Sequence, residues 1–420
     1  MKDVLLSKFF ELERWEIAIE TGVQKKIDKG DLRKLCTPEV RKALYDAIVS
    51  DQYEIAPPHQ ALIPKDNGDF RTVYVNENVD RIFLSIANDL LFEICGDMIH
   101  PSCKSYQKGI GCGKVVQQVS KTICETNGNY RGFKADLSKY FDTVMIETID
   151  GIFGKIEDRC GNSKIISVLR KYYHSDLCFD ADGNLISHYQ SLKQGCAVAS
   201  FLSDVALAHI DSIISSFPGY YVRYSDDLLY VGPYVEEVMV LLKSELDKMQ
   251  LTLNPKKVEY LTDDKWFKFL GFNIKGNQIT LSKSRVKSFQ KEVEKRSIKK
   301  RTVSATKARN AINRYLYFGD GQYSWATQVL PIINVEKDID TLNEFVMDCI
   351  RACETGKKKI GGLGSVMDKE DYTITRGVGK NVKANKEKTI KDIEGYYSIR
   401  CMRNALLTSR DAYNTLVRSM

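Results

Sequence analysis

The sequence has little of several features that mark particular classes of protein. Its 420 residues include only nine Pro and five His, and the eleven Cys are scattered without a Cys-x-x-Cys pair. This distribution argues against a zinc site and favours reduced structural thiols. No apolar stretch approaches the roughly 18 residues of a membrane span, and acidic residues interrupt the apolar pattern of the N-terminus, which is unlike a signal peptide. We therefore predict a cytoplasmic protein without membrane association.

The sequence also lacks the glycine-rich loop by which many ATPases bind phosphate. The stretch from Ser105 to Lys114 contains three glycines but no Gly-x-x-x-x-Gly-Lys-Ser/Thr pattern, so an ATPase loop is excluded there. The hydrophobic fraction of 43% and the charged fraction of 28% are ordinary for a globular protein. The length allows two or three compact units.

Positive charge is concentrated in one segment. The formal net charge is only +7, yet residues 283–309 contain eleven Lys and Arg against two acidic residues. The remainder of the chain is therefore close to neutral. A local basic segment in an otherwise balanced protein predicts a polyanion bound at one place, and a solvated basic helix is the alternative.

The stretch from Tyr220 to Val231 is the most informative part of the sequence. Two apolar runs rich in strand-forming residues flank Ser225-Asp226-Asp227, a pattern that predicts a tight β-hairpin. Adjacent carboxylates at such a turn repel each other unless a cation lies between them, and Mg²⁺ takes carboxylate and phosphate oxygens as ligands. A solvated acidic turn is the alternative, although a solvent turn does not need Tyr and Leu packed on both sides. Asp136, at the end of another predicted strand, is the candidate third carboxylate.

Other segments carry local secondary-structure signals. Residues 1–52 are predicted to be helical, and Thr37-Pro38 is a strong helix start, with Thr as the N-cap and Pro at the first helical position. An unusually long apolar helix is predicted over residues 197–215, and a loop rich in Gly and Lys over residues 355–392.

A second hairpin is predicted near residue 67, where two apolar strands flank an Asp-Asn-Gly turn. Lys65 and Arg71 lie on either side of this turn and can reach one common ligand. Arg is suited to forked contacts with phosphate, and Lys acts as a mobile point charge. Surface hairpins often carry such residues, so this pair taken alone is weak evidence for a ligand site.

Taken in order, these motifs resemble the fingers and palm of a reverse transcriptase. In chain order, the motifs are a strand that ends in Asp, a Gln-Gly that precedes a helix, a Tyr-x-Asp-Asp hairpin, a Lys and a Phe-Leu-Gly. The resemblance covers residues 53–282. It implies an α+β right-hand polymerase, with an antiparallel palm sheet packed on helices and a mostly α-helical thumb and C-terminal extension. The domains expected from it are an N-terminal helical segment (1–52), fingers and palm (53–282), a basic helical thumb (283–350) and a C-terminal extension (351–420).

The resemblance also implies roles for residues that match the motifs of the family. Asp136, Asp226 and Asp227 match its metal ligands, the carbonyl of Leu137 would be a further ligand, and the cofactor would be two Mg²⁺ ions. Lys257 matches a lysine proposed to protonate the leaving pyrophosphate.

Four further residues match the nucleotide-binding positions of the family. Lys65 and Arg71 match the pair that grips the triphosphate, and Gln194 matches a residue near the sugar and base. Phe141 falls where reverse transcriptases pack an aromatic ring under the sugar, which implies a preference for deoxynucleotides, although core packing is the alternative. The expected primer and template contacts come from the Phe-Leu-Gly motif and the basic segment: Phe269, Leu270, Gly271, Lys283, Arg285, Lys287, Lys295 and Arg296.

The motifs depart from many members of the family at two places. Residues 194–200 lack the prolines that often follow Gln-Gly, and Ser225 replaces the commoner Ala, Met or Val. No endonuclease, ribonuclease H or protease motif accompanies the palm. The sequence most resembles the stand-alone bacterial reverse transcriptases associated with antiviral defence and abortive infection.

This resemblance implies synthesis of DNA from dNTPs on an RNA template, namely a cognate structured non-coding RNA. Untemplated or protein-primed DNA synthesis is one alternative. An RNA-binding module with a vestigial polymerase site is the other, although the intact carboxylates argue against it.

Overall fold

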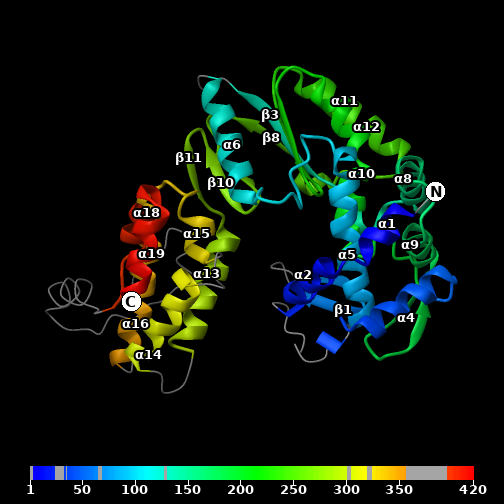
Figure 1. The fold of residues 1–420 in the computed structure, drawn as a ribbon. Coiled ribbons are helices and arrows are strands. Elements are labelled where there is room, and N and C mark those ends of the chain that lie inside the picture. The colour runs from blue at the N-terminus through cyan, green and yellow to red at the C-terminus, as the bar shows by residue number, and fades with distance from the viewer. Residues whose placement is uncertain are drawn as a thin grey trace, which may run out of the picture. The chain divides into compact units, whose positions relative to one another are not determined.

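A computed structural model describes residues 3–23, 33–34, 36–64, 69–126, 130–299, 304–318, 324–355 and 395–420. The chain forms two compact units (Figure 1). The first comprises Met1–Ile110 with Arg131–Leu261, and the second comprises Gly111–Tyr130 with Thr262–Met420. Three predictions fall on residues outside the described ranges: the turn at 66–68, Lys65 beside it, and the loop predicted over 355–392 from residue 356 onward.

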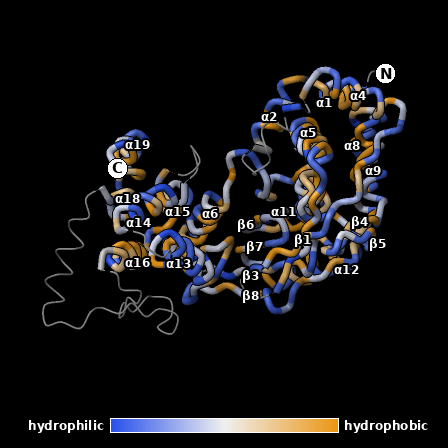
Figure 2. The backbone as a smooth tube through the Cα atoms, turned by 90° about the horizontal axis from the view of Figure 1, so that it is seen from below, coloured by the Kyte–Doolittle hydropathy of each residue, from blue (hydrophilic) through white to orange (hydrophobic). Residues whose placement is uncertain are grey.

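The first unit is built on a sheet with the strand order β6-β7-β3-β8, which Figure 2 shows side by side. The strands are β3 (Arg131–Asp136), β6 (Tyr220–Tyr224), β7 (Asp227–Val231) and β8 (Glu259–Thr262). The predicted hairpin is confirmed, because β6 and β7 pair antiparallel from Tyr220–Val231 to Tyr224–Asp227. Strand β7 also pairs antiparallel with β3, which makes it a central strand with neighbours on both sides. Its apolar residues Leu228, Leu229 and Tyr230 are accordingly buried.

Helices from both sides of the hairpin in the sequence surround this sheet. They are α5 (Asn78–Cys95), α7 (Tyr140–Thr143), α8 (Ile146–Cys160), α9 (Lys164–His174), α10 (Ala199–Ala206), α11 (Ala208–Ser215) and α12 (Val235–Lys248). Their apolar faces and the sheet share one hydrophobic core. The core therefore fixes both the strand that ends at Asp136 and the hairpin that carries the other two carboxylates.

The single long helix predicted over residues 197–215 is wrong, because the structure divides this segment at Leu207 into α10 and α11. No Pro or Gly causes the break. Instead, the carbonyl of Ser203 accepts a bond from the Tyr140 hydroxyl at 2.7 Å, and the carbonyl of Asp204 accepts one from Arg223 Nη2 at 2.7 Å. Donors that insert into the helical hydrogen-bond ladder bend or break a helix. These partners come from distant parts of the chain, so local sequence does not reveal them.

A second sheet in the first unit has the strand order β2-β1-β4-β5. It consists of β1 (His59–Pro64), β2 (Phe70–Val75), β4 (Leu177–Phe179) and β5 (Leu185–Ser187). Strands β1 and β2 pair antiparallel with Pro64 opposite Phe70, as the predicted hairpin requires, and β1 pairs parallel with β4. This sheet carries Arg71.

The described part of the N-terminal segment is mostly helical, and its last helix ends at Val49. Its helices are α1 (Val4–Phe9), α2 (Leu12–Val23) and α4 (Pro38–Val49). The predicted helix start is confirmed, because the Thr37 hydroxyl accepts a hydrogen bond from the Val40 amide at 3.4 Å and Pro38 is the first helical residue. Asp3 caps α1 in the same way, with its Oδ1 accepting from the Leu6 amide at 2.9 Å.

The second unit joins a small sheet to a group of helices. The sheet has the order β11-β10-β9, formed by β9 (Phe267–Phe269), β10 (Phe272–Lys275) and β11 (Gln278–Leu281). Helix α6 (Cys112–Glu125) packs on this sheet, where the Ser120 hydroxyl donates to the Gly276 carbonyl at 2.7 Å. The remaining helices are α13 (Lys283–Arg296), α14 (Ala305–Asn313), the π-helix η3 (Arg314–Phe318), α15 (Trp325–Val329), α16 (Glu336–Thr355), α18 (Ile399–Thr408) and α19 (Arg410–Arg418). Among the described helices of both units, none is long and apolar enough to cross a membrane.

Candidate active site

The three predicted carboxylates lie at one end of the central sheet. Asp136 is the last residue of β3 and stands directly opposite Asp227, the first residue of β7. Asp226 lies in the turn between β6 and β7, and its carbonyl accepts a hydrogen bond from the Leu137 amide at 3.1 Å. The pairing of β3 with β7 therefore brings Asp136 beside carboxylates that are 90 and 91 residues further along the sequence.

The carboxylates of the turn are in an unfavourable electrostatic environment. Burial, followed by the charges of Asp226 and Asp136, raises the pKa of Asp227 to about 7. Burial and then Asp136 likewise raise the pKa of Asp226, while Lys257 and Arg71 lower it by a smaller amount. Raised values of this kind are expected where buried anions repel one another without a cation between them.

The donor chemistry of this site fits divalent cations, because carboxylate oxygens are their preferred ligands. The side chains are not, however, gathered into a ready-made cluster. Within the described ranges, no group of three or more His, Cys, Asp or Glu side chains is arranged to hold a metal ion. Asp136 instead pairs with Lys257, whose Nζ lies 2.6 Å from Asp136 Oδ1. An ammonium group thus supplies the positive charge beside Asp136.

A short backbone turn, which is bonded to Asp136, places Lys257 beside that residue. It ends the 3₁₀ turn η2 (Pro255–Lys257), and the preceding Asn254 amide donates to the Asp136 carbonyl at 2.7 Å. The side chain of Lys257 remains 57% exposed, whereas that of Asp136 is 9% exposed. Lys257 is therefore both next to the carboxylates and open to a ligand, as its predicted role requires.

We expect the stability of the metal-free protein to fall as the pH rises from about 4 to about 7, because of Asp227. A group whose pKa is higher in the folded than in the unfolded state stabilises the fold when protonated, and this contribution is lost as the pH passes its folded pKa. Asp204, whose pKa burial raises to about 6, acts in the same direction. Thermal unfolding in a chelator at several pH values would measure the slope.

The matched variant for this measurement is Asp227→Asn, which keeps the shape of the side chain and removes its titration. Its melting temperature should depend less on pH than that of the unmodified protein, with the contributions of Asp204 and Asp226 remaining. Added Mg²⁺ should stabilise the unmodified protein more at about pH 8 than at about pH 5.5, because protons compete with the cation for the carboxylates. A slope unchanged in Asp227→Asn would show that Asp227 is not the group responsible.

The residues predicted to bind the nucleotide lie on three elements of the first unit. Arg71, on β2, is exposed and close enough for its charge to lower the pKa of Asp226. Phe141, in α7, is half-buried beside Tyr140, and its carbonyl accepts from the Leu192 amide at 3.2 Å. Gln194 lies in the same loop as Leu192, and the Gln194 carbonyl accepts a hydrogen bond from the Tyr74 amide of β2 at 2.7 Å. Their backbones are thus tied together, while Lys65 lies outside the described residues.

A sequence model of the family described as "Reverse transcriptase (RNA-dependent DNA polymerase)" matches residues 63–274, half of the chain. The chain belongs to the reverse transcriptase family. The predicted α+β right-hand fold, with fingers and palm and a mostly helical thumb, is confirmed. The predicted enzyme class, RNA-directed DNA polymerase, is the class of this family. We therefore interpret the sheet that carries the carboxylates as the palm sheet, and the sheet of β1 and β2 as part of the fingers.

Three solved structures of telomerase are similar to this chain. They are apo telomerase from Candida tropicalis truncated from its C-terminal domain (16% identity, TM-score 0.42, covering 56% of this chain and 59% of that chain), apo telomerase from Candida tropicalis (14%, 0.43, 72% and 59%), and telomerase from Candida albicans in complex with a TWJ fragment of telomeric RNA (13%, 0.44, 90% and 68%). The chain thus matches about three fifths of the length of the first two. No match is found among curated proteins.

The residues that we predict to hold the primer and template of this reverse transcriptase lie in the second unit. Phe269, Leu270 and Gly271 form the turn from β9 to β10, in which Leu270 and Gly271 have φ angles of +47° and +80°. The Arg285 side chain packs against this turn and over the Phe272 ring, 4.3 Å from its centroid.

The other basic residues of this set all lie on α13. Arg296 forms an ion pair with Glu292 and lies over the Tyr315 ring, 4.3 Å from its centroid. Lys283, Lys287 and Lys295 are exposed on the same helix. Both arginines thus contact an aromatic ring of their own unit, and the exposed lysines present positive charge to solvent, where a phosphate backbone can be bound.

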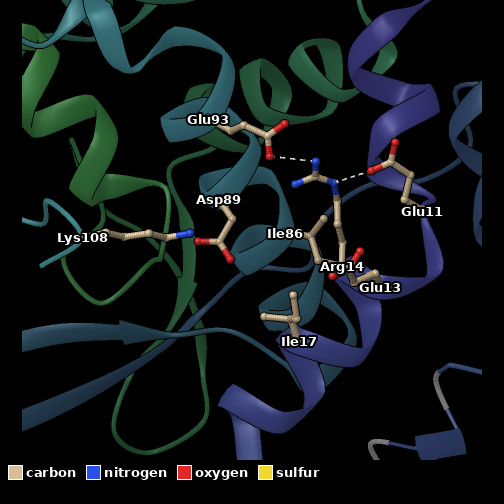
Figure 3. A pocket seen from close by; sticks show the side chains of 8 residues that line it. All are labelled: Glu11, Glu13, Arg14, Ile17, Ile86, Asp89, Glu93 and Lys108. Atoms are coloured by element: carbon tan, nitrogen blue, oxygen red, sulfur yellow. Dashed lines mark hydrogen bonds and ion pairs between the residues drawn. The ribbon is translucent and has the colours of Figure 1, made fainter.

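A pocket of about 250 Å³ in the first unit is separate from the carboxylate site (Figure 3). Acidic residues outnumber basic ones in its lining, and Arg14 binds two of them, Glu11 at 2.9 Å and Glu93 at 2.8 Å. The ion pair of Arg14 with Glu93 joins α2 to α5. The pocket is lined by Glu11, Glu13, Arg14, Ile17, Ile86, Asp89, Glu93 and Lys108.

Two sets of residues around the site were not predicted from the sequence. Lys193 is 1% exposed, donates to the Ser175 carbonyl at 2.8 Å and to Gln190 Oε1 at 3.0 Å, and thereby holds the loop of Gln194. Burial lowers the pKa of Lys193 to about 8. Arg223 is fully buried in β6 with acidic partners from α10 and α11. The signal available in the sequence was a charged residue within an apolar strand, together with two Asp in an apolar helical segment.

Proposed function

We propose that this protein is an RNA-directed DNA polymerase that adds dNTPs to a primer end by phosphoryl transfer. The observation that supports it best is the register of the palm sheet, in which Asp136 stands opposite Asp227 with Asp226 in the adjoining turn. Phosphoryl transfer needs positioning and neutralisation of charge more than covalent chemistry, which suits a site of carboxylates beside exposed cations. Asp136, Asp226 and Asp227, with the carbonyl of Leu137, would hold two Mg²⁺ ions. Bound there, these ions would activate the attacking hydroxyl and neutralise charge on the phosphates.

The chain itself would supply the remaining contacts to the triphosphate. Arg71 forms forked bonds with phosphate oxygens, and Lys65 adds a second positive charge from across the hairpin. Lys257 donates a proton to the leaving pyrophosphate, and the negative charge of Asp136, 2.6 Å away, keeps its ammonium group in position. Gln194 contributes to the site of the sugar and base, and the exposed lysines of α13 bind the backbone of the template and primer.

Phe141→Ala is expected to increase incorporation of ribonucleotides relative to deoxynucleotides by roughly 10- to 100-fold, because a smaller side chain under the sugar admits a 2′-hydroxyl. The hydrogen bond of its carbonyl to the Leu192 amide should survive, so the loop of Gln194 should keep its place. Single-nucleotide primer extension with each sugar type measures the ratio. Phe217→Ala, which removes another half-buried ring beside Tyr234, is the matched control. Equal ratios in both variants would show that Phe141 is a packing residue.

We further propose that the template is a cognate structured non-coding RNA and that the enzyme serves antiviral defence. The support is the resemblance of the motifs in residues 53–282 to those of the stand-alone bacterial enzymes. Untemplated or protein-primed synthesis and RNA binding without catalysis are the alternatives.

Sequencing of the nucleic acid that co-purifies with the protein would test this function, with an Asp226→Ala/Asp227→Ala double variant beside it. A discrete RNA with complementary DNA, the DNA being absent from the variant, is the expected result. DNA without an RNA counterpart, or DNA attached to the protein, would favour the first alternative. RNA alone from both proteins would favour the second.

A further inference from the structure

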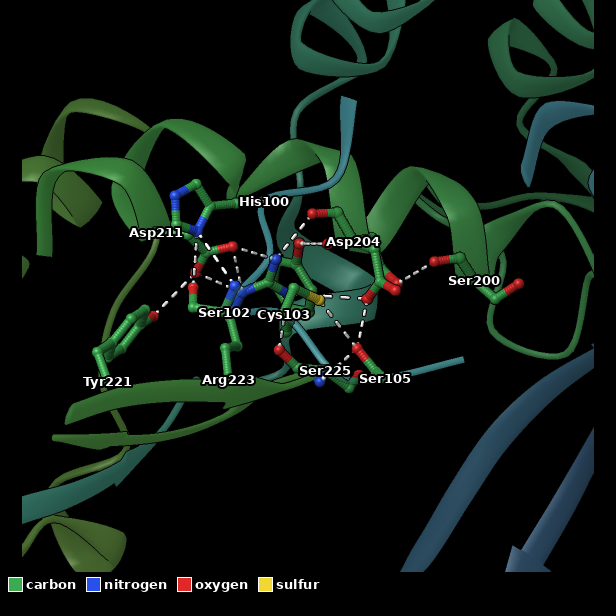
Figure 4. A network of polar contacts seen from close by, with 12 residues as sticks. His100, Ser102, Cys103, Ser105, Ser200, Asp204, Asp211, Tyr221, Arg223 and Ser225 are labelled. Carbon is green, nitrogen blue, oxygen red and sulfur yellow. Dashed lines mark hydrogen bonds and ion pairs between the residues drawn. The ribbon is translucent and has the colours of Figure 1, made fainter. Parts of the chain in front are cut away.

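A network of buried polar groups binds Ser225, the first residue of the Ser225-Asp226-Asp227 turn (Figure 4). At its centre is Arg223, which is 0% exposed. Its Nε and Nη2 atoms bind Asp211 at 2.8 Å and 2.6 Å, so the two charges neutralise each other. The Tyr221 hydroxyl also donates to Asp211 Oδ1, at 2.9 Å.

The guanidinium of Arg223 also donates to two backbone carbonyls. Nη2 donates to the Asp204 carbonyl at 2.7 Å, at the break between α10 and α11, and Nη1 donates to the Ser225 carbonyl at 3.2 Å. Because the planar group has fixed donor directions, one side chain ties the helix break to the turn that carries the carboxylates.

The amide of Ser225 is held from the same side by Ser105. The Ser105 hydroxyl donates to Asp204 Oδ1 at 2.5 Å and accepts from the Ser225 amide at 2.9 Å. A hydroxyl has one proton, so donation to Asp204 leaves its lone pairs for the Ser225 N–H. Both Ser105 and Asp204 are 0% exposed, so water does not compete for these bonds.

These bonds act on a residue in an unfavourable conformation. Ser225 has a φ of +58°, in the left-handed region that residues with a Cβ atom rarely adopt. Such a conformation persists only where the surroundings determine it. Here the N–H and the C=O of Ser225 each bind a buried side chain, so the surroundings determine both of its peptide planes.

We propose that Ser105 and Arg223 are positioning residues that hold Ser225 in its left-handed conformation. This conformation fixes the direction in which the two following carboxylates leave the turn, toward Asp136 on the neighbouring strand. The inference rests on the proposed function, because it assigns these carboxylates to a cation site. Second-layer hydrogen bonds that orient ligands commonly change metal affinity by about 10- to 100-fold when removed.

Ser105 offers a sharper test than Arg223. Removing Arg223 would leave Asp211 buried without a partner, and the variant would lose its fold for that reason alone. Ser105→Ala removes one hydroxyl, and Ser105→Thr retains it. Ser203→Ala is the matched control, because Ser203 is also 0% exposed but its hydroxyl donates only to the Ser200 carbonyl of its own helical segment.

The first readout is binding of Mn²⁺ to the full protein without nucleic acid, measured by electron paramagnetic resonance. Ser105→Ala is expected to weaken binding about tenfold or more, whereas Ser105→Thr and Ser203→Ala should stay close to the unmodified protein. Adding Ser225→Gly to Ser105→Ala should recover part of the loss, because glycine adopts positive φ without strain. Melting temperatures of the same variants separate this recovery from a general gain of stability, because a merely structural role would make Mn²⁺ affinity follow the melting temperature.

The second readout is primer extension as a function of Mg²⁺ concentration. Ser105→Ala should raise the concentration needed for half-maximal rate, with binding of the template–primer unchanged. Equal Mn²⁺ affinity in Ser105→Ala and Ser203→Ala would overturn the proposal, as would the lack of any recovery with Ser225→Gly. If the proposed function itself is wrong, the result differs: the unmodified protein would bind Mn²⁺ but extend no primer.

Discussion

Asp226→Asn and Asp227→Asn should each lower the rate of nucleotide addition by about 1,000-fold or more, while the fold persists. Asn has the shape of Asp but lacks the charge that holds a divalent cation. Losing several kcal/mol of transition-state stabilisation corresponds to a rate decrease of this order. The measurement is single-turnover extension of a primer on an RNA template, with protein in excess.

The same substitutions, which lower the rate, should preserve or increase the stability of the fold when no cation is present. Burial and mutual repulsion raise the pKa of both carboxyl groups, so neutral side chains remove an unfavourable interaction at about pH 8. We therefore expect melting temperatures in a chelator to stay level or rise. Asp182→Asn, at an exposed hairpin, is the control and should change neither quantity. Full activity in Asp226→Asn or Asp227→Asn would remove the turn from the active site.

The catalytic hairpin could be predicted because its signals are local. Apolar runs on both sides of Ser225-Asp226-Asp227 set the strands, and the polar break sets the turn. The strand that ends at Asp136 was found in the same way. Their pairing is not local, however: the residues made Asp136 a candidate third carboxylate, and its role as a metal ligand beside the hairpin was implied by the resemblance to a family. The structure places Asp136 opposite Asp227.

The surroundings of the hairpin could not be predicted, because they depend on contacts between distant segments. The break at Leu207 arises from donors on Tyr140 and Arg223, and apolar periodicity alone favours one continuous helix. Helix α6 packs with β10 and β11, although the bonded Ser120 and Gly276 are 156 residues apart in the sequence. Ser105 lies in a glycine-rich stretch whose sequence gave no sign of a bond to Ser225.

The loop that contains Gln194 also requires a glycine at position 195. Its φ is +109°, and a Cβ atom at this position would lie 2.8 Å from the Tyr74 carbonyl oxygen and 3.2 Å from the Tyr74 nitrogen. Both contacts are with the backbone of β2, which cannot move aside as a flexible side chain can. The close approach allows the Gln194 carbonyl to accept from the Tyr74 amide at 2.7 Å. Gly195 thus joins the loop of Gln194 to the strand of Arg71.

Gly195→Ala is accordingly expected to lower kcat/KM for dNTPs by about 100-fold or more and to destabilise the first unit by about 3 kcal/mol. Part of this cost is backbone strain, which Gly183→Ala would share, because Gly183 has a φ of +83° but no atom within 4 Å of its would-be Cβ. Gly183→Ala should therefore lose stability without losing activity. If both variants kept full activity, the contact between the loop and β2 would have no role in binding the nucleotide. A selective loss in Gly195→Ala would show that the close approach itself, rather than a positive φ, is what the nucleotide site requires.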